Sequence, residues 1–78
     1  MTIKIYSTKT CTYCKAAKEY FAQNNLAYEE FDVGTDVAKR NEMIEKTGQL
    51  GVPVIDIDGK IFVGFDQPEI AAAVGLAA

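Results

Sequence analysis

The segment Thr10-Cys11-Thr12-Tyr13-Cys14-Lys15 holds the only two cysteines of this 78-residue chain. A short alternating run, Ile3-Lys4-Ile5-Tyr6, lies just before it and predicts a β-strand. Residues 16–23 follow it, and they favour a helix throughout. A Cys-x-x-Cys pair where a strand passes into a helix is typical of a thiol–disulfide redox site.

The start of a helix is a favourable place for a reactive thiol. The first backbone N–H groups of a helix lack partners within it, and the helix dipole adds positive potential there. A thiolate at such a position is stabilised, which lowers the pKa of the thiol and makes it nucleophilic at neutral pH. Cys14 lies one turn further on, on nearly the same face. We therefore expect Cys11 to be the exposed nucleophile, and Cys14 to resolve a mixed disulfide formed on Cys11.

Other roles of the two cysteines remain as alternatives. A purely structural disulfide would close a loop of about four residues and add only about 2 kcal/mol, less than a long-range bridge. Zinc normally takes four Cys, His or carboxylate ligands, and this chain has two cysteines and no histidine. One chain could supply only half of a thiolate site, so we expect no metal ligands in it. A metal or cluster held between two chains and a pair of unreactive cysteines stay open.

Length and composition predict one domain over residues 1–78. The hydrophobic content of 49% is enough for a packed core, and the charged content of 24% is ordinary for a globular surface. The formal charge of −3 argues against nucleic-acid binding, which needs clustered Lys and Arg. No apolar run approaches the roughly 18 residues of a membrane span, and no secretory signal is visible. Two closely spaced cysteines without others fit a reducing cytosol, so we expect a cytoplasmic protein.

The order of predicted elements is β-α-β-α-β-β-α, an α/β fold. Asp58-Gly59 between two apolar runs is the strongest hairpin signal in the chain. Gly48 suits the left-handed end of the second helix. A parallel βαβ unit joined to an antiparallel hairpin predicts a four-stranded mixed sheet with helices on both faces. We expect strands over residues 3–7, 26–33, 54–57 and 60–63, and helices from Cys11 to about residue 24, over 37–46, and from about residue 66.

The spacing of apolar residues also predicts which side chains are buried. Ile3 and Ile5 share one face of the first strand, and Tyr6 lies with Lys4 on the other. Tyr20 and Phe21 are expected in or at the edge of the core. Four residues of the second helix can cover the sheet: Val37, Ala38, Met43 and Ile44. Charged side chains of the two long helices are expected mainly in solvent: Lys15, Lys18, Lys39, Arg40, Glu42, Glu45 and Lys46.

Three motifs in this order resemble those of the glutaredoxins, small members of the thioredoxin-fold superfamily. They are Cys11-Thr12-Tyr13-Cys14, Gly51-Val52-Pro53 before the third strand, and Gly64-Phe65-Asp66 after the hairpin. The resemblance spans nearly the whole chain and implies a thioredoxin-like fold. Each motif alone is weak, and the combination on this order of elements is specific.

The resemblance implies roles for residues beyond the cysteines. Pro53 would follow a cis peptide, leaving the backbone N–H and C=O of Val52 for an extended thiol peptide, whereas an ordinary trans proline would merely begin a strand. Gly64, Phe65 and Asp66 align with the segment that holds the γ-glutamyl end of glutathione, and a helix cap is the structural alternative for Asp66. The remaining candidates have weaker signals. Lys9 is either a positive charge near Cys11 or a plain loop lysine, and Thr12 and Tyr13 would form part of the reactive surface. Arg40 would bind the glycyl carboxylate, or it is a plain surface charge.

The chain departs from the usual glutaredoxin pattern at several positions. Thr12 replaces the proline usual between the cysteines, and Gly51 replaces a threonine. Lys9 lies two residues before Cys11, whereas the common lysine lies three before, where this chain has Thr8. One glycine rather than two precedes Phe65. The Gly-Phe pair is similar to that of NrdH-type redoxins, which receive electrons from thioredoxin reductase.

The sequence thus predicts a thiol–disulfide oxidoreductase that reduces protein or glutathione mixed disulfides. We expect no tightly bound cofactor, glutathione as co-substrate, disulfide-containing proteins as partners, glutathione or thioredoxin reductase as electron source, and a monomer. One alternative is an NrdH-like redoxin that supplies ribonucleotide reductase. A second is an iron–sulfur carrier, because some glutaredoxins without the motif proline bridge a cluster between two chains with glutathione.

Overall fold

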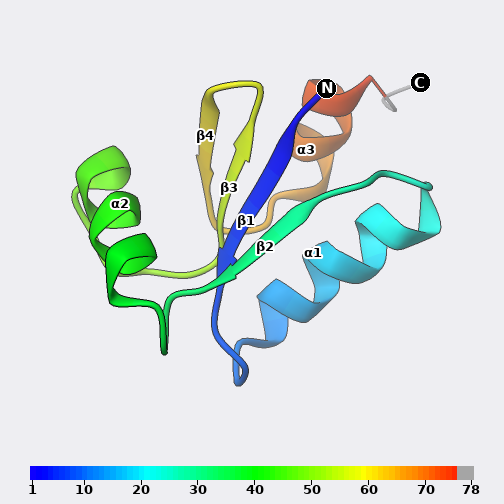
Figure 1. The fold of residues 1–78 in the computed structure, drawn as a ribbon. Helices are drawn as coiled ribbons and strands as arrows, with labels where there is room; N and C mark the ends of the chain where they lie inside the picture. Colours follow the sequence, from blue (N-terminus) through cyan, green and yellow to red (C-terminus); the bar gives the residue numbers. More distant parts are fainter. Residues whose placement is uncertain (76–78) are drawn as a thin grey trace.

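The computed structural model describes residues 1–75, and residues 76–78 of the expected domain lie outside the described part. Figure 1 shows the expected order of elements. None of the helices within residues 1–75 is long and apolar enough to cross a membrane. The elements are β1 (Ile3–Ser7), α1 (Thr12–Gln23), β2 (Glu29–Asp32), α2 (Val37–Thr47), β3 (Val54–Ile57), β4 (Lys60–Val63) and α3 (Gln67–Val74).

The strands form one mixed sheet in the order β2-β1-β3-β4. β1 pairs in parallel with β2, and the α1 crossover connects them. β3 runs antiparallel to both β1 and β4, and the turn between β3 and β4 is the predicted Asp58-Gly59 hairpin. The chain therefore has the four-stranded, thioredoxin-like arrangement expected from its sequence.

Helices cover both faces of this sheet, with α1 and α3 on one side and α2 on the other (Figure 1). Strand alternation sends the side chains of β1 to two separate cores, as predicted for Ile5 and Tyr6. The core under α1 and α3 consists of Ile3, Ile5, Ala17, Phe21, Ile55, Ile57 and Ile70. The smaller core under α2 consists of Tyr6, Val33, Met43 and Val54.

The second strand is shorter than expected, because it begins at Glu29 rather than at residue 26. The backbone N–H of Leu26 donates to the carbonyl of Phe21 at 2.9 Å, which closes the end of α1 and withholds this residue from the sheet. Leu26 and Tyr28 nevertheless pack against the core under α1. These apolar residues thus contact the core, but the predicted start of the strand at residue 26 is wrong.

The predicted apolar face of α2 is only partly buried. Met43 is fully buried and Ile44 is half-buried, whereas Val37 is 55% exposed and Ala38 is exposed too. The contact of α2 with the sheet is made through Met43, well past the first turn of the helix. The expectation was therefore wrong for Val37 and Ala38, because helical spacing does not show which turns rest on the sheet.

Two charged residues of α2 that were expected in solvent instead bind the sheet. Lys46 Nζ donates to Tyr6 Oη at 2.9 Å and to Asp56 Oδ2 at 3.1 Å, and Tyr6 Oη donates to Glu42 Oε1 at 3.0 Å. The same hydrogen bonds hold the pKa of Lys46 above its ordinary value, with the bond to Tyr6 as the largest cause. This Lys46 network joins α2 to β1 and β3 over the smaller core.

Candidate functional site

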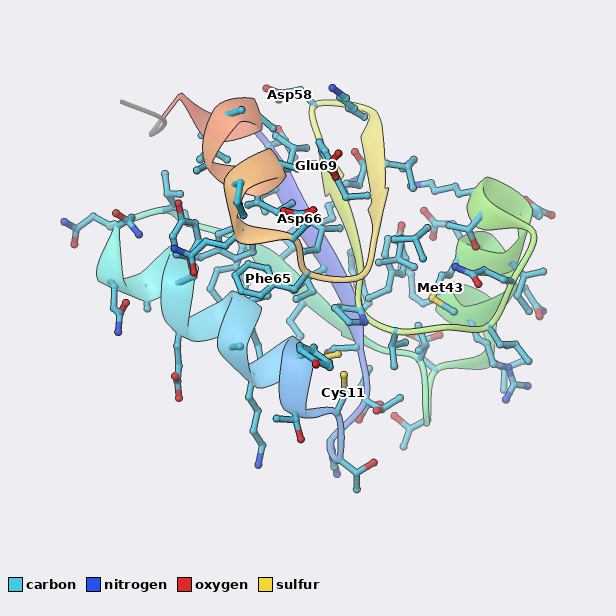
Figure 2. All side chains as sticks on the ribbon, turned by 180° about the vertical axis from the view of Figure 1, so that it is seen from behind. Cys11, Met43, Asp58, Phe65, Asp66 and Glu69 are labelled. Carbon is cyan, nitrogen blue, oxygen red and sulfur yellow. The ribbon has the colours of Figure 1, made fainter. Side chains whose placement is uncertain are left out.

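The three motifs singled out in the sequence meet at one end of the sheet. The antiparallel register places Tyr6 opposite Val54, so the loop after β1 and the loop before β3 leave the sheet side by side. Val54 is also paired with Val63, which brings residues 64–66 to the same end. Figure 2 shows Cys11 at this end of the molecule, far from the hairpin turn at Asp58. The fold therefore gathers three motifs, of which the second follows the first after about forty residues and the third follows the second after about ten.

Cys11 is the N-cap residue of α1. Its extended backbone (φ −84°, ψ 114°) directs the side chain back over the helix start, and its Sγ accepts a hydrogen bond from the backbone N–H of Cys14 at 3.1 Å. This is the position in which serine or aspartate normally caps a helix. The sulfur of Cys11, which is partly exposed, therefore receives both a donor and the positive end of the helix dipole. These are the surroundings that stabilise a thiolate.

Cys14 lies in the opposite environment, because its side chain is completely buried. Burial raises the pKa of the Cys14 thiol well above its ordinary value, and the hydrogen bond with Cys11 acts in the same direction. A hydrogen bond from the backbone of Thr8 and the charge of Lys18 act against this rise. The pair is therefore asymmetric, with an accessible sulfur at the helix start and a protected one a turn later.

The Val52–Pro53 peptide bond is cis, as the resemblance implies. Pro53 is buried, and its carbonyl accepts a hydrogen bond from the N–H of Gly64 at 2.8 Å. This bond ties the second motif to the third. Val52 is half-exposed, and its backbone makes no hydrogen bond to any of residues 1–75, so its N–H and C=O are open to a ligand.

The third motif lies against α1 and begins α3. The ring of Phe65 is 5.8 Å from that of Tyr20, and Figure 2 shows Phe65 beside α1. Gly64 has a φ of 87°, which a residue with a side chain would adopt only under strain. Asp66 is the N-cap of α3 and accepts from the N–H of Glu69 at 3.4 Å, so the structural alternative for this residue is present in the fold.

The remaining sequence candidates differ in how close they come to the cysteines. Thr12 and Tyr13 belong to the first turn of α1 and are exposed beside Cys11, with 67% of Tyr13 accessible. Lys9 is an exposed residue of the preceding loop. Arg40 is on α2, on the other side of the sheet from α1, and no described contact joins it to the cysteines.

One group near the cysteines was not recognised in the sequence. Lys18 Nζ and Ser7 Oγ both donate to Glu30 Oε2, at 2.6 Å and 2.8 Å. The sequence predicts Lys18 in solvent, and this prediction is wrong because the side chain crosses to Glu30 of β2. The signal that could have identified it is its spacing of four residues from Cys14, which places both on one helix face.

Metal ligands are scarce in the described part of the chain. Within residues 1–75, no group of three or more His, Cys, Asp or Glu side chains could hold a metal ion. The two cysteines alone fall short of the four ligands of a zinc site. The chemistry that the arrangement itself supports is nucleophilic attack by one sulfur and displacement by the other.

Comparison with known proteins gives consistent results. The family model described as Glutaredoxin matches residues 3–63. An uncharacterised glutaredoxin-like 8.6 kDa protein from the rubredoxin operon of Clostridium pasteurianum is 50% identical over 68 residues, covering 87% of this chain and 91% of that protein. Glutaredoxin 3 of Escherichia coli strain K12 is 36% identical over 65 residues, covering 83% and 78% respectively.

Two further proteins are similar over nearly their whole length. The glutaredoxin-like protein NrdH of Lactococcus lactis is 29% identical over 72 residues, covering 88% of this chain and 94% of that protein. The crystal structure of the thioredoxin-like protein BC3987 superposes with a TM-score of 0.87 at 35% identity, covering 92% of this chain and 99% of that one. The chain is thus similar to glutaredoxins, to glutaredoxin-like proteins and to a protein with a thioredoxin-like structure.

Proposed function

The chain belongs to the glutaredoxin family, and on that premise we propose that it reduces protein and glutathione mixed disulfides through Cys11 and Cys14. It is a glutaredoxin-like redox protein, and the proposal concerns the reaction that its two thiols perform. The observation that carries it is the contrast between the cysteines. Cys11 is a partly exposed helix cap, whereas Cys14 is completely buried one turn later.

The reaction transfers two electrons from the dithiol to the substrate. The Cys11 thiolate attacks one sulfur of the substrate disulfide, a Cys11–substrate disulfide forms, and the other substrate sulfur leaves and takes up a proton. The Cys14 thiol then loses its proton and attacks the sulfur of Cys11. The second substrate sulfur leaves as a thiolate and is protonated. The protein ends with a Cys11–Cys14 disulfide, which an external reductant must reduce.

The surface around Cys11 supports binding of an extended thiol peptide such as glutathione or a segment of a protein. The N–H and C=O of Val52, which bind none of residues 1–75, offer strand-like hydrogen bonds to such a peptide. We propose that Asp66 accepts a hydrogen bond from the ammonium group of glutathione and that the start of α3, which Asp66 caps, receives its carboxylate. Arg40 is the weakest candidate of this set, because it is on the α2 side of the sheet. We propose glutathione as a co-substrate with no tightly bound cofactor, acting with a monomeric protein in the cytoplasm.

Two substitutions test the assignment of roles. Cys11→Ser should abolish reduction of a model disulfide, because the attacking sulfur is lost. Cys14→Ser should still attack but should accumulate a mixed disulfide, which mass spectrometry detects as the mass of the bound thiol. Full dithiol activity of Cys11→Ser would overturn the assignment, and Glu19→Gln, at an exposed site of α1, serves as the folded control.

A second candidate concerns the electron donor. The similarity to NrdH and the departures at Thr12 and Gly51 favour a redoxin that is reduced by thioredoxin reductase and supplies ribonucleotide reductase. An NADPH-coupled assay should compare glutathione with glutathione reductase against thioredoxin reductase. Turnover with thioredoxin reductase alone would reject glutathione as the co-substrate and would support the NrdH-like role.

An iron–sulfur carrier is the remaining alternative. Thr12 in place of the motif proline is the observation that raises it, and two chains would have to share one cluster through Cys11. Anaerobic reconstitution with iron, sulfide and glutathione tests it directly. A colourless monomer after this treatment would exclude the carrier role, whereas a coloured dimer that loses its colour in Cys11→Ser would support it.

A further inference from the structure

The ion pair between α1 and β2 is not used by the reaction described above. Lys18 Nζ lies 2.6 Å from Glu30 Oε2, and the Lys18 side chain is only 26% exposed. The hydroxyl of the buried Ser7 donates to the same carboxylate oxygen at 2.8 Å. Ser7 therefore anchors Glu30 to β1 independently of Lys18.

This cluster lines a groove of about 280 Å³ beside the cysteines. The groove is bounded by the end of β1, the loop that follows it, α1 and β2. The same loop contacts both cysteines, because the carbonyl of Thr8 accepts from the N–H of Cys11 at 3.4 Å and its backbone also hydrogen-bonds Cys14. Solvent in the groove thus reaches Lys18 and Glu30 but not the buried sulfur. The residues that line it are Ser7, Thr8, Lys9, Lys18, Glu30 and Asp32.

Lys18 is placed to act on Cys14. The two residues are four apart on one helix, so their side chains lie on the same face, one turn from each other. A lysine has a long flexible stem, and its ammonium group can move between neighbouring acceptors. The anchored carboxylate of Glu30 binds this ammonium group at 2.6 Å, and the Cys14 thiol lies one turn earlier on the same helix face.

We propose that Lys18 is shared between the Glu30 carboxylate and the Cys14 sulfur, and that Glu30 thereby limits how readily Cys14 becomes the attacking thiolate. The inference rests on the proposed function, because it concerns the step in which Cys14 resolves the mixed disulfide. Lys18 and Glu30 are positioning residues in this scheme, since neither exchanges electrons or touches the substrate.

The charges around Cys14 agree with this scheme. Burial is the largest cause of the raised pKa of Cys14, and the charge of Lys18 lowers that pKa. The hydrogen bond to Glu30 is the largest cause of the raised pKa of Lys18, so the lysine stays charged through the neutral range. The titratable groups that face this site are Cys11 and Lys18 on α1, Lys9 in the loop after β1, and Tyr28, Glu30 and Asp32 on or beside β2.

The resolving step balances without a further reactant. Cys14 loses the proton that the departing substrate thiolate takes up, and the resulting Cys14 thiolate is stabilised by the charge of the Lys18 ammonium group. Its electron pair forms the bond to the Cys11 sulfur, the bond between Cys11 and the substrate sulfur breaks, and the substrate thiolate leaves and takes up a proton. Both electrons that reduce the substrate come from the two cysteines.

A purely structural ion pair would give a different result from a shared lysine. If the pair only held α1 on β2, removing either partner would weaken the fold in the same direction. If Lys18 is shared, removing it should hinder ionisation of Cys14, whereas removing the Glu30 charge should favour it. The two substitutions should therefore have opposite effects on the resolving step.

Stopped-flow reaction with an aromatic disulfide, DTNB, separates the two chemical steps. Attack by Cys11 releases the first coloured thiolate at a rate that rises with the DTNB concentration, and attack by Cys14 releases the second at a rate that does not. At pH 7 we expect Lys18→Met to slow the second phase and Glu30→Gln to accelerate it, each by about threefold, which corresponds to a pKa change of about half a unit. The pH profile of the second-phase rate constant should shift to higher pH in Lys18→Met and to lower pH in Glu30→Gln.

Three control variants make the outcome decisive. Lys18→Arg keeps the charge and should restore the wild-type profile. Lys15→Met and Glu29→Gln remove exposed charges from the same two elements and should leave the second phase unchanged. Shifts of Lys18→Met and Glu30→Gln in the same direction, or none beyond these controls, would overturn the inference.

Failure of the proposed function would look different. A wild-type protein that releases only one equivalent of thiolate, and forms no Cys11–Cys14 disulfide, would contradict the dithiol reaction itself. Two equivalents from the wild type with identical variant profiles would leave the reaction intact and reject only the role of Lys18 and Glu30.

Discussion

Each face of the sheet carries a lysine that reaches from a helix to a strand, and the two lysines have different neighbours. Under α2, Lys46 is bound by Tyr6 and Asp56, and Glu42 lies 3.4 Å away. Under α1, Lys18 has one carboxylate partner, Glu30, and lies one turn from a thiol. The comparison shows that one kind of contact can serve two purposes. Such a contact stabilises the fold where the lysine has several oxygen partners, and it can change the reactivity of a thiol that lies one turn away.

Removing Asp56 should have the largest effect on stability. Its Oδ2 accepts from Lys46, and its Oδ1 accepts from the N–H of Gly59 at 2.8 Å, so one carboxylate supports both α2 and the hairpin turn. We expect Asp56→Ala to lower the free energy of unfolding by about 2–4 kcal/mol in urea titrations. Glu45→Ala, at an exposed site of α2, should stay within about 0.5 kcal/mol. The rate of disulfide reduction per folded molecule should not change. A lower rate would show that the Lys46 network also affects the cysteines on the other face of the sheet.

The caps of α2 and α3 allow a matched test of the same distinction. Asp36 accepts from Lys39 N–H at 3.0 Å, and Asp66 accepts from Glu69 N–H at 3.4 Å. Replacing either aspartate by Ala should cost about 1 kcal/mol of stability, measured by thermal unfolding. Only Asp66→Ala should also raise KM for a glutathione mixed disulfide. Equal KM values for the two variants would show that Asp66 does not bind the glutathione mixed disulfide.

The carboxylate of Glu42, which binds both Lys39 and the Lys46 network, should also make stability depend on acidic pH. The hydrogen bond from Lys39 is the largest cause that holds the pKa of Glu42 at about 2, below its ordinary 4.5. A lowered carboxyl pKa contributes stability above the unfolded pKa, and this contribution is lost as the pH falls from 4.5 toward 2. The side chain is 34% exposed, so solvent screening limits the effect to less than about 1 kcal/mol.

Unfolding in urea at neutral pH and at about pH 3 measures this contribution. Glu42→Gln should lose less stability on acidification than the wild type, whereas Glu45→Gln should behave like the wild type. Equal acid sensitivity of Glu42→Gln and the wild type would show that the network does not couple to pH.

The smallest effect on stability is expected from Lys18→Met. The pair with Glu30 is partly exposed, and such pairs contribute about 0.5 kcal/mol or less. Urea titration should therefore find this variant nearly as stable as the wild type, although we expect its resolving step to be slower. A loss comparable to that of Asp56→Ala would mean that both lysines serve mainly to hold helices on the sheet.

Much of the fold follows from local signals that the sequence contains. The Cys pair after an alternating run marked the start of α1, Gly48 marked the left-handed end of α2, and Asp58-Gly59 marked the hairpin. Each is a property of a few neighbouring residues, such as a positive φ at glycine or a side chain that caps a helix. The motif order was also sufficient to identify the fold family, and it placed the cis bond before Pro53 correctly.

The errors on the two long helices share one cause, because each concerns a contact between distant segments, whereas the late start of β2 reflects the local hydrogen bond from Leu26 N–H to the carbonyl of Phe21. Lys18 and Lys46 were assigned to solvent since they lie on charged stretches of their helices. Only the packed sheet brings Glu30 to one and Asp56 to the other. Val37 was assigned to the core from helical spacing, which does not show where α2 meets the sheet.

By itself, the sequence determined the order of elements, the caps and turns, and the two sulfur atoms one helical turn apart, because these depend on interactions among near neighbours. The tertiary structure alone decided that Cys14 is completely buried, that the carbonyl of Pro53 binds the N–H of Gly64, and that each long helix has a lysine bound to the sheet. Burial and ion pairing depend on which distant strands lie together, and that arrangement is fixed only when the two cores pack.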